Sequence, residues 1–179
     1  MLNQITLPRS SNQPPEDAFE LLTACHVRIH HFAAAAVRLA HAQAAPPEEV
    51  RQSANGVYRY LSVSLPLHEA DEEDTLRPRL DAVADDHVRH ALIAMHDQHQ
   101  AIDELIERLL PLLLLLERNP AAIHDAGAEM CSITKALQEI FEAHLKLEED
   151  AIFPAIRTLL REDERTAMLA EMQQRRRQG

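Results

Sequence analysis

The sequence predicts an all-α protein, an antiparallel up-down-up-down four-helix bundle with a short extra C-terminal helix. Only 3 of the 179 residues are glycine and 3% are aromatic, whereas sheet proteins need turn glycines and strand aromatics. Apolar residues recur at three- and four-residue steps over long segments, which is the spacing of one helix face. The breaks between these segments are short, and short connections favour antiparallel neighbours.

The elements follow from this periodicity and from the prolines that interrupt it. Helices are expected, in order, over residues 16–45, 48–80, 81–118 and 121–160, with a fifth, amphipathic helix over 163–173. Pro46-Pro47 ends the first helix, and kinks are expected at Pro66, Pro78 and Pro154. The domain organisation is then a flexible leader over 1–15, the bundle over 16–162, and a short helix with a basic tail over 163–179.

Charge and composition exclude several classes of partner and location. The net charge of −11 disfavours nucleic acid and anionic membranes, and the Arg175–Arg177 run is expected to be solvated. Two cysteines cannot form a disulfide framework, and the leucine run over 112–116 is too short to span a bilayer. No secretory signal pattern is present, so a cytoplasmic protein is expected. The leucine run could dock against a second copy to form a homodimer.

An internal repeat divides the chain into two helix pairs. The segment from His68 to Leu80 aligns without gaps on the segment from His144 to Ile156. Both read His-x-x-x-Glu-Glu-Asp, followed by an aliphatic residue, a proline and a second aliphatic residue at matching offsets. Placing His26 on His99 aligns the preceding helices as well. Each pair therefore has a histidine on its first helix and His-x-x-x-Glu on its second.

This spacing favours a metal site. Residues four apart on a helix have β-carbons roughly 5–6 Å apart, so a histidine and the glutamate four residues later can reach one metal. The inward faces supply five imidazoles and two carboxylates, from His26, His68, His96, His99, His144, Glu72 and Glu148. Burying these groups unpaired would cost several kcal/mol each. The donor set suits iron, manganese or zinc. If both carboxylates bridge two metals, the five nitrogens divide three and two, which leaves one metal an open position.

The constellation resembles the hemerythrin-like family, the His-His-Glu cation-binding four-helix bundles, from about Phe19 to Leu160. The doubled His-x-x-x-Glu-Glu-x-x-aliphatic-x-Pro motif is the most specific part, and Cys25-His26 in the first helix fits as well. The resemblance implies a non-haem di-iron centre, oxo- or hydroxo-bridged, that binds dioxygen or related small molecules or senses redox state. It implies as ligands His26 on the first helix, His68 and Glu72 on the second, and His144 and Glu148 on the fourth.

The third and fourth helices differ from the oxygen-carrying members of that family. Those members have two histidines four apart on the third helix, whereas this chain has His96 and His99, three apart, with Met95 at the expected place. Their last carboxylate lies five residues after its histidine, so Glu148 and Glu149 are alternatives for that ligand.

Three functions are consistent with these residues. The first is a di-iron protein that binds or senses a small ligand such as dioxygen, nitric oxide or peroxide. The second is an interaction or regulatory module with a structural mononuclear or zinc site. The third is a di-iron enzyme that acts on peroxide or in iron-cluster repair, although the sequence shows no substrate pocket that favours an enzyme. The zinc-protease signature HExxH is excluded, because Glu72 stands where its second histidine must be.

Overall fold

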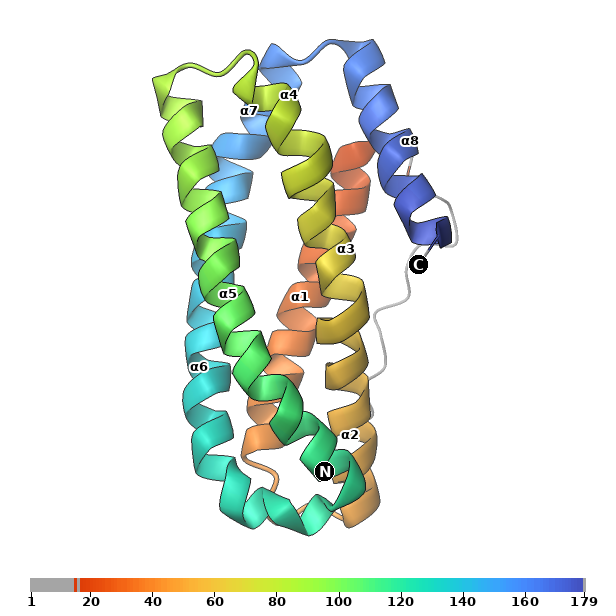
Figure 1. Cartoon of the computed structure of the whole chain (residues 1–179), viewed down its shortest axis with the longest axis vertical. Helices are drawn as coiled ribbons and strands as arrows, with labels where there is room; N and C mark the ends of the chain where they lie inside the picture. Colours follow the sequence, from red (N-terminus) through yellow and green to blue (C-terminus); the bar gives the residue numbers. More distant parts are fainter. Residues whose placement is uncertain (1–14, 16, 179) are drawn as a thin grey trace.

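The computed structural model describes Pro15 and residues 17–178. Four helical passes run antiparallel to one another, and a fifth helix descends along one side of the bundle (Figure 1). The described part of the chain contains no strand. This confirms the predicted fold class. The leader expected over 1–15 lies, apart from Pro15, outside the described residues.

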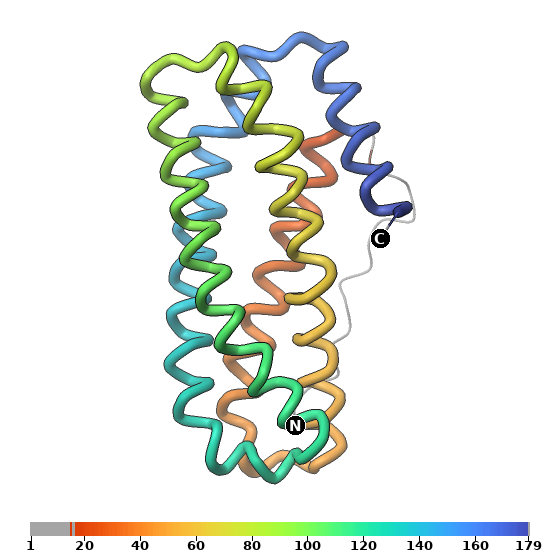
Figure 2. Tube along the Cα trace, viewed as in Figure 1, coloured from red at the N-terminus to blue at the C-terminus, as the bar shows by residue number. Residues whose placement is uncertain are grey.

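The first and third passes are single helices, and the other two are built of several segments, as the traced chain shows (Figure 2). The first pass is α1 (Ala18–Ala40), and the third is α5 (Asp86–Arg118). The second pass consists of α2 (Pro47–Arg59), η1 (Tyr60–Ser64), α3 (Leu65–Ala70), η2 (Asp71–Leu76) and α4 (Arg77–Asp81). The fourth consists of η3 (Pro120–Ala122), α6 (Ile123–Leu147), η4 (Glu148–Ile152) and α7 (Phe153–Leu159). The fifth helix is α8 (Glu162–Gln178).

Aspartate caps set the start of two helices. The Asp17 side chain accepts a hydrogen bond from the Glu20 backbone N–H at 2.8 Å, and Asp85 accepts one from Val88 at 2.9 Å. Each carboxylate satisfies a backbone donor that has no partner within its helix. The third pass therefore begins five residues later than the sequence pattern predicted, at Asp86.

The second and fourth passes stay continuous through their prolines because the helix widens just before each one. The segments η1, η2 and η4 are π-helical, and each ends two residues before a proline, namely Pro66, Pro78 and Pro154. A proline removes one backbone hydrogen bond and its ring displaces the carbonyl four residues earlier. The wider turn accommodates both effects. Such turns are frequent at functional sites, and η2 and η4 contain Glu72 and Glu148.

The apolar core consists of two clusters. The lower cluster, at the bottom of Figure 1, draws its buried residues from 29–65 and 102–145. The upper cluster draws them from 18–22, 76–95 and 152–172. The stretch left between them contains at least one histidine on each of the first three passes, and on the fourth pass it contains Glu148, one turn after His144. The polar residues therefore form a layer across the bundle with apolar packing on both sides.

The leucine run over 112–116 belongs mainly to this core. Leu113 and Leu116 are fully buried in the lower cluster, and Leu115 is 43% exposed. Homodimer formation through this run stays a prediction. None of the described helices is long and apolar enough to cross a membrane.

The C-terminal helix packs against the bundle instead of forming a loose tail. Met168 and Met172, four residues apart, are fully buried in the upper cluster. Farther along α8, Arg175 donates to Asp71 through Nη1, and Arg176 Nη2 lies 2.5 Å from the other oxygen of this fully buried carboxylate. The expectation that the arginine run is solvated is therefore wrong for Arg175 and Arg176. The sequence pattern missed the contact because Asp71 lies on a distant pass.

Candidate metal centre

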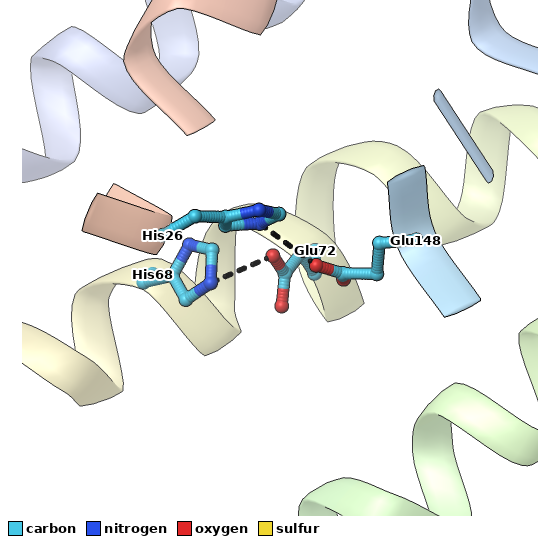
Figure 3. Close-up of side chains that lie close together, drawn as sticks. All are labelled: His26, His68, Glu72 and Glu148. Atoms are coloured by element: carbon cyan, nitrogen blue, oxygen red, sulfur yellow. Dashed lines mark ion pairs between the residues drawn. The ribbon is translucent and has the colours of Figure 1, made fainter. Parts of the chain in front are cut away.

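Six buried side chains from all four passes converge in the polar layer. They form two groups of four, within which the potential ligand atoms all lie within 4.8 Å of one another. The first group is His26, His68, Glu72 and Glu148, and the second is Glu72, His99, His144 and Glu148. In the first group, side chains from α1, α3, η2 and η4 point toward one another (Figure 3). Both carboxylates belong to both groups, so the arrangement offers two adjacent positions that share Glu72 and Glu148.

The distances follow the repeat. Each histidine of a first helix approaches the glutamate of the other half: His26 Nε2 lies 2.9 Å from Glu148 Oε2, and His99 Nε2 lies 3.1 Å from Glu72 Oε2. Each histidine of a second helix approaches the glutamate four residues later: His68 Nε2 lies 3.0 Å from Glu72 Oε1, and His144 Nε2 lies 3.7 Å from Glu148 Oε1. The two helix pairs thus contribute equivalent donors in an approximately two-fold arrangement.

Several of these atoms are close together and yet do not satisfy one another. His26 Nε2, His68 Nε2, Glu72 Oε1 and both oxygens of Glu148 are buried and make no hydrogen bond of good geometry within the described residues. An unsatisfied buried polar atom costs about 1–3 kcal/mol, and more when charged. A cation bound between these atoms would satisfy them together. The site therefore fits a metal ion by its donor types and by its unsatisfied atoms.

The charge on Glu72 is balanced by its histidines. Burial raises the pKa of Glu72, but the nearby charge of His68 and the hydrogen bond from His99 outweigh burial and hold it well below its usual value. Burial lowers the pKa of His99, but bonds to Glu72 and Glu73 outweigh this and raise it to about 9. The pKa of His68 rises well above its usual value for the same reason, through Glu72. The metal-free centre therefore keeps the positive charge on His68 and His99.

The second carboxylate behaves differently. Burial and the neighbouring Glu72 charge raise the pKa of Glu148 to about 7. Burial lowers the pKa of His144 to about 3, and the charge of Glu72 does not compensate. Two carboxylates this close are hard to ionise together, and a divalent cation between them would remove that repulsion.

In three of the four histidines, the ring nitrogen that faces away from the centre, Nδ1, is also hydrogen-bonded. His26 Nδ1 donates to Glu149 Oε1 at 3.1 Å, and His99 Nδ1 donates to Glu73 Oε1 at 2.7 Å. His144 Nδ1 donates to Gln98 Oε1 at 3.2 Å. Such partners fix the tautomer and orientation of a ligating imidazole. Two of these partners, Glu73 and Glu149, are the second glutamates of the Glu-Glu pairs in the repeat. The doubled Glu-Glu of the repeat was the sequence signal for them, since the second glutamate of each pair reaches a histidine of the other half.

The structure brings together six of the seven predicted metal residues and leaves His96 outside. The His96 side chain is 40% exposed, and its Nδ1 donates to Glu73 Oε1 at 3.1 Å. Met95, four residues before His99, faces inward instead and is fully buried in the upper cluster. The imidazoles therefore divide two and two between the groups, in place of the predicted three and two. Whether the six residues ligate a metal stays a prediction.

The structure also separates the two candidate glutamates of the fourth pass. Glu148 is fully buried and belongs to both groups. The Glu149 side chain is 55% exposed and contacts the outer nitrogen of His26. The glutamate four residues after His144 thus faces the centre, and the one five residues after it supports a neighbouring histidine.

A small pocket adjoins the centre on the side of the lower cluster. Its lining combines three histidines of the centre with mostly apolar neighbours: His68, His99 and His144 with Ile29, Leu65, Glu69, Ile102 and Phe141. A molecule in this pocket would touch the imidazoles of both groups.

The fold and the polar layer define a four-helix bundle with a buried histidine–glutamate cluster compatible with metal binding. The sequence matches the hemerythrin HHE cation-binding domain over residues 17–156, and the chain belongs to this family. No curated protein matches the chain.

Proposed function

We propose that the centre binds two iron ions and takes up a small ligand such as dioxygen, nitric oxide or peroxide. The observation that carries this proposal is the sharing of Glu72 and Glu148 by two groups, each completed by two imidazoles. Two carboxylates common to both positions suit a pair of ions held side by side. A single ion would leave the other two imidazoles without a partner.

The donor set supports iron over zinc. Each position offers two imidazole nitrogens and two carboxylate oxygens, and neither group contains a thiolate. Four donors complete the tetrahedral shell of structural zinc, whereas iron takes more ligands and, with imidazole and carboxylate donors, keeps open positions in non-haem proteins. Bound iron would supply those positions and a change of oxidation state. Manganese has similar donor preferences and is an alternative metal.

The surrounding residues support a small ligand with little charge. Besides the three histidines and Glu69, the pocket beside the centre is lined by apolar side chains, namely Ile29, Leu65, Ile102 and Phe141. Apolar clusters lie on both sides of the polar layer. This mostly apolar lining and the small size of the pocket favour a diatomic molecule or a peroxide beside the imidazoles over a large polar substrate.

The test is metal stoichiometry combined with spectra. The purified protein is loaded with Fe²⁺ without oxygen, and about two ions per chain are expected from the two groups. Loading should raise the melting temperature, since a ligand of the native state stabilises it by about 2.7 kcal/mol at 100 times its Kd. Exposure to oxygen or nitric oxide should then produce near-ultraviolet and visible absorption.

A variant with Glu72→Gln and Glu148→Gln is the matched control. It keeps the volume of both side chains and should bind no iron and show no absorption. If the wild-type chain binds no iron, the proposal is wrong. Binding of one zinc ion with no spectral response would favour the structural module, and turnover of peroxide lost in the control variant would favour the enzyme.

A further inference from the structure

One histidine of the centre differs from the other three at its outer nitrogen. The Nδ1 atoms of His26, His99 and His144 each donate to a side-chain oxygen. The Nδ1 of His68 is buried as well, but it makes no hydrogen bond of good geometry to the residues that the structure describes. A ligating imidazole normally has a partner at this atom, so the position needs an acceptor.

The internal repeat indicates which residue occupies the acceptor position. Gln98, the acceptor for His144, directly precedes His99 on α5. Because His26 corresponds to His99, the residue that corresponds to Gln98 is Cys25 on α1. Its thiol lies near enough to the His68 ring for each to affect the charge of the other, and His68 corresponds to His144. In the repeat, Cys25 therefore occupies the position relative to His68 that Gln98 occupies relative to His144.

The surroundings of Cys25 make its sulfur an acceptor. The residue is buried, with 3% of its surface exposed. Arg28 Nη2 donates to Sγ at 3.0 Å, and Arg176 Nη2 donates to it at 3.6 Å. Both arginines that contact the sulfur are therefore donors, and His68 Nδ1–H is a donor too.

We propose that the Cys25 sulfur is the positioning group for His68, accepting the Nδ1–H hydrogen bond that holds Nε2 toward Glu72 and the metal position. This inference rests on the proposed metal centre. It makes the two metal positions unequal, because one is supported by glutamate and sulfur and the other by glutamate and amide. Sulfur is a weaker and more polarisable acceptor than an amide oxygen, so the two positions should differ in affinity.

The first test compares variants that keep or remove the acceptor. Cys25→Val keeps an apolar side chain of similar size but removes the acceptor, and Cys25→Ser keeps an acceptor. Stepwise Zn²⁺ affinities are measured against a competing chelator. Cys25→Val should weaken one of the two affinities by about 10–100-fold, and Cys25→Ser should retain it. Gln98→Leu should weaken the other affinity instead.

Cys131→Val is the matched control, because this second cysteine contacts His41 and the Ala40 carbonyl in the lower part of the bundle. It should leave both affinities at the wild-type values. The melting temperature of each metal-free variant is measured in parallel. If Cys25→Val lowers both affinities in proportion to a lower melting temperature, the residue is a packing residue and the inference is wrong.

The second test reads the His68 ring directly. In the metal-free protein labelled with ¹⁵N-histidine, the His68 Nδ1–H proton should be present in wild type and Cys25→Ser and should shift or vanish in Cys25→Val. If wild type binds two ions and Cys25→Val changes neither the two affinities nor this NMR signal, the inference fails while the proposed function stands.

If wild type binds no metal, the proposed function fails, and the His68 Nδ1–H signal alone decides the inference. A thiolate-to-metal absorption band with Co²⁺, lost in Cys25→Ser, would make the sulfur a ligand and overturn the inference.

Discussion

The two halves of the repeat are alike on the inside and different on the outside. Toward the centre they present the same donors at equivalent positions. On the outer side of η2, Asp71 and Thr75 occupy the positions that Leu147 and Ala151 occupy in the fourth pass. The first half is covered by α8, whose Arg175 binds both Asp71 and Thr75. The inner face thus repeats one set of buried donors in both halves, whereas the outer face needs only a partner for whatever polar group it buries.

The largest effect is expected at the carboxylates that both halves share. Glu72→Gln or Glu148→Gln should abolish binding of both ions, since each residue belongs to both groups. His68→Ala should remove mainly the ion of its own group. Removing a ligand should weaken metal affinity by more than the roughly 10–100-fold that is typical when a hydrogen-bond partner of a ligand is removed. Metal content per chain after dialysis measures this. Equal loss in His68→Ala and Glu72→Gln would contradict two positions with shared carboxylates.

The next effect concerns the outer contact that only the first half has. Replacing Arg175 and Arg176 by alanine leaves Asp71 buried without its charged partners. Breaking a buried ion pair on one side costs about 3–5 kcal/mol, so the free energy of unfolding in urea should fall by an amount in this range.

Adding Asp71→Leu to that double variant replaces the buried aspartate with leucine, the residue type at the equivalent position of the second half, Leu147. It should recover much of the loss, because an apolar side chain needs no ionic partner. A triple variant no more stable than the double variant would show that the stability comes from α8 packing through Met168 and Met172 rather than from the ion pairs.

A smaller effect is expected from pH. The pKa of His99 is raised from 6.5 to about 9, because Glu72 and Glu73 outweigh the effect of its burial. A raised pKa of the folded state stabilises the fold fully below the unfolded value, and this stabilisation is lost as the pH rises through the folded value. The metal-free protein should therefore lose stability between pH 6.5 and 9.

Metal affinity should change in the opposite sense over the same range, because the ion must displace the His99 proton. Urea unfolding of the metal-free protein and Zn²⁺ competition, both followed against pH, measure the two trends. His99→Gln is the control and should make both trends shallower, with the remaining pH dependence due to His68 and Glu148. Stability that rises with pH in the metal-free protein would contradict the charge balance described for Glu72.

The smallest effect is expected at His96. Its partly exposed ring contacts Glu73 and lies outside both groups. His96→Ala should retain about two ions per chain, with an affinity change well below that of His99→Ala. Loss of an ion in His96→Ala would mean that the predicted division of five imidazoles into three and two is correct for the loaded protein.

Much of the fold and most of the candidate centre could be predicted from residue patterns. Apolar periodicity and proline positions indicated the four passes, and the repeat indicated His68, Glu72, His144 and Glu148. His96 shows where such reasoning ends, because a spacing of three places two residues near one face without deciding which faces inward. The neighbouring Met95 fills the apolar space and decides it.

What the sequence by itself determined is the set of inner donors, because duplication and helical periodicity act over a few residues and can be read locally. What only the tertiary structure decided is every contact between passes. Asp71 with Arg176 and Gln98 with His144 join residues on different helices. No local pattern encodes these pairs, since they depend on how the widened turns and the packed helices bring distant side chains together.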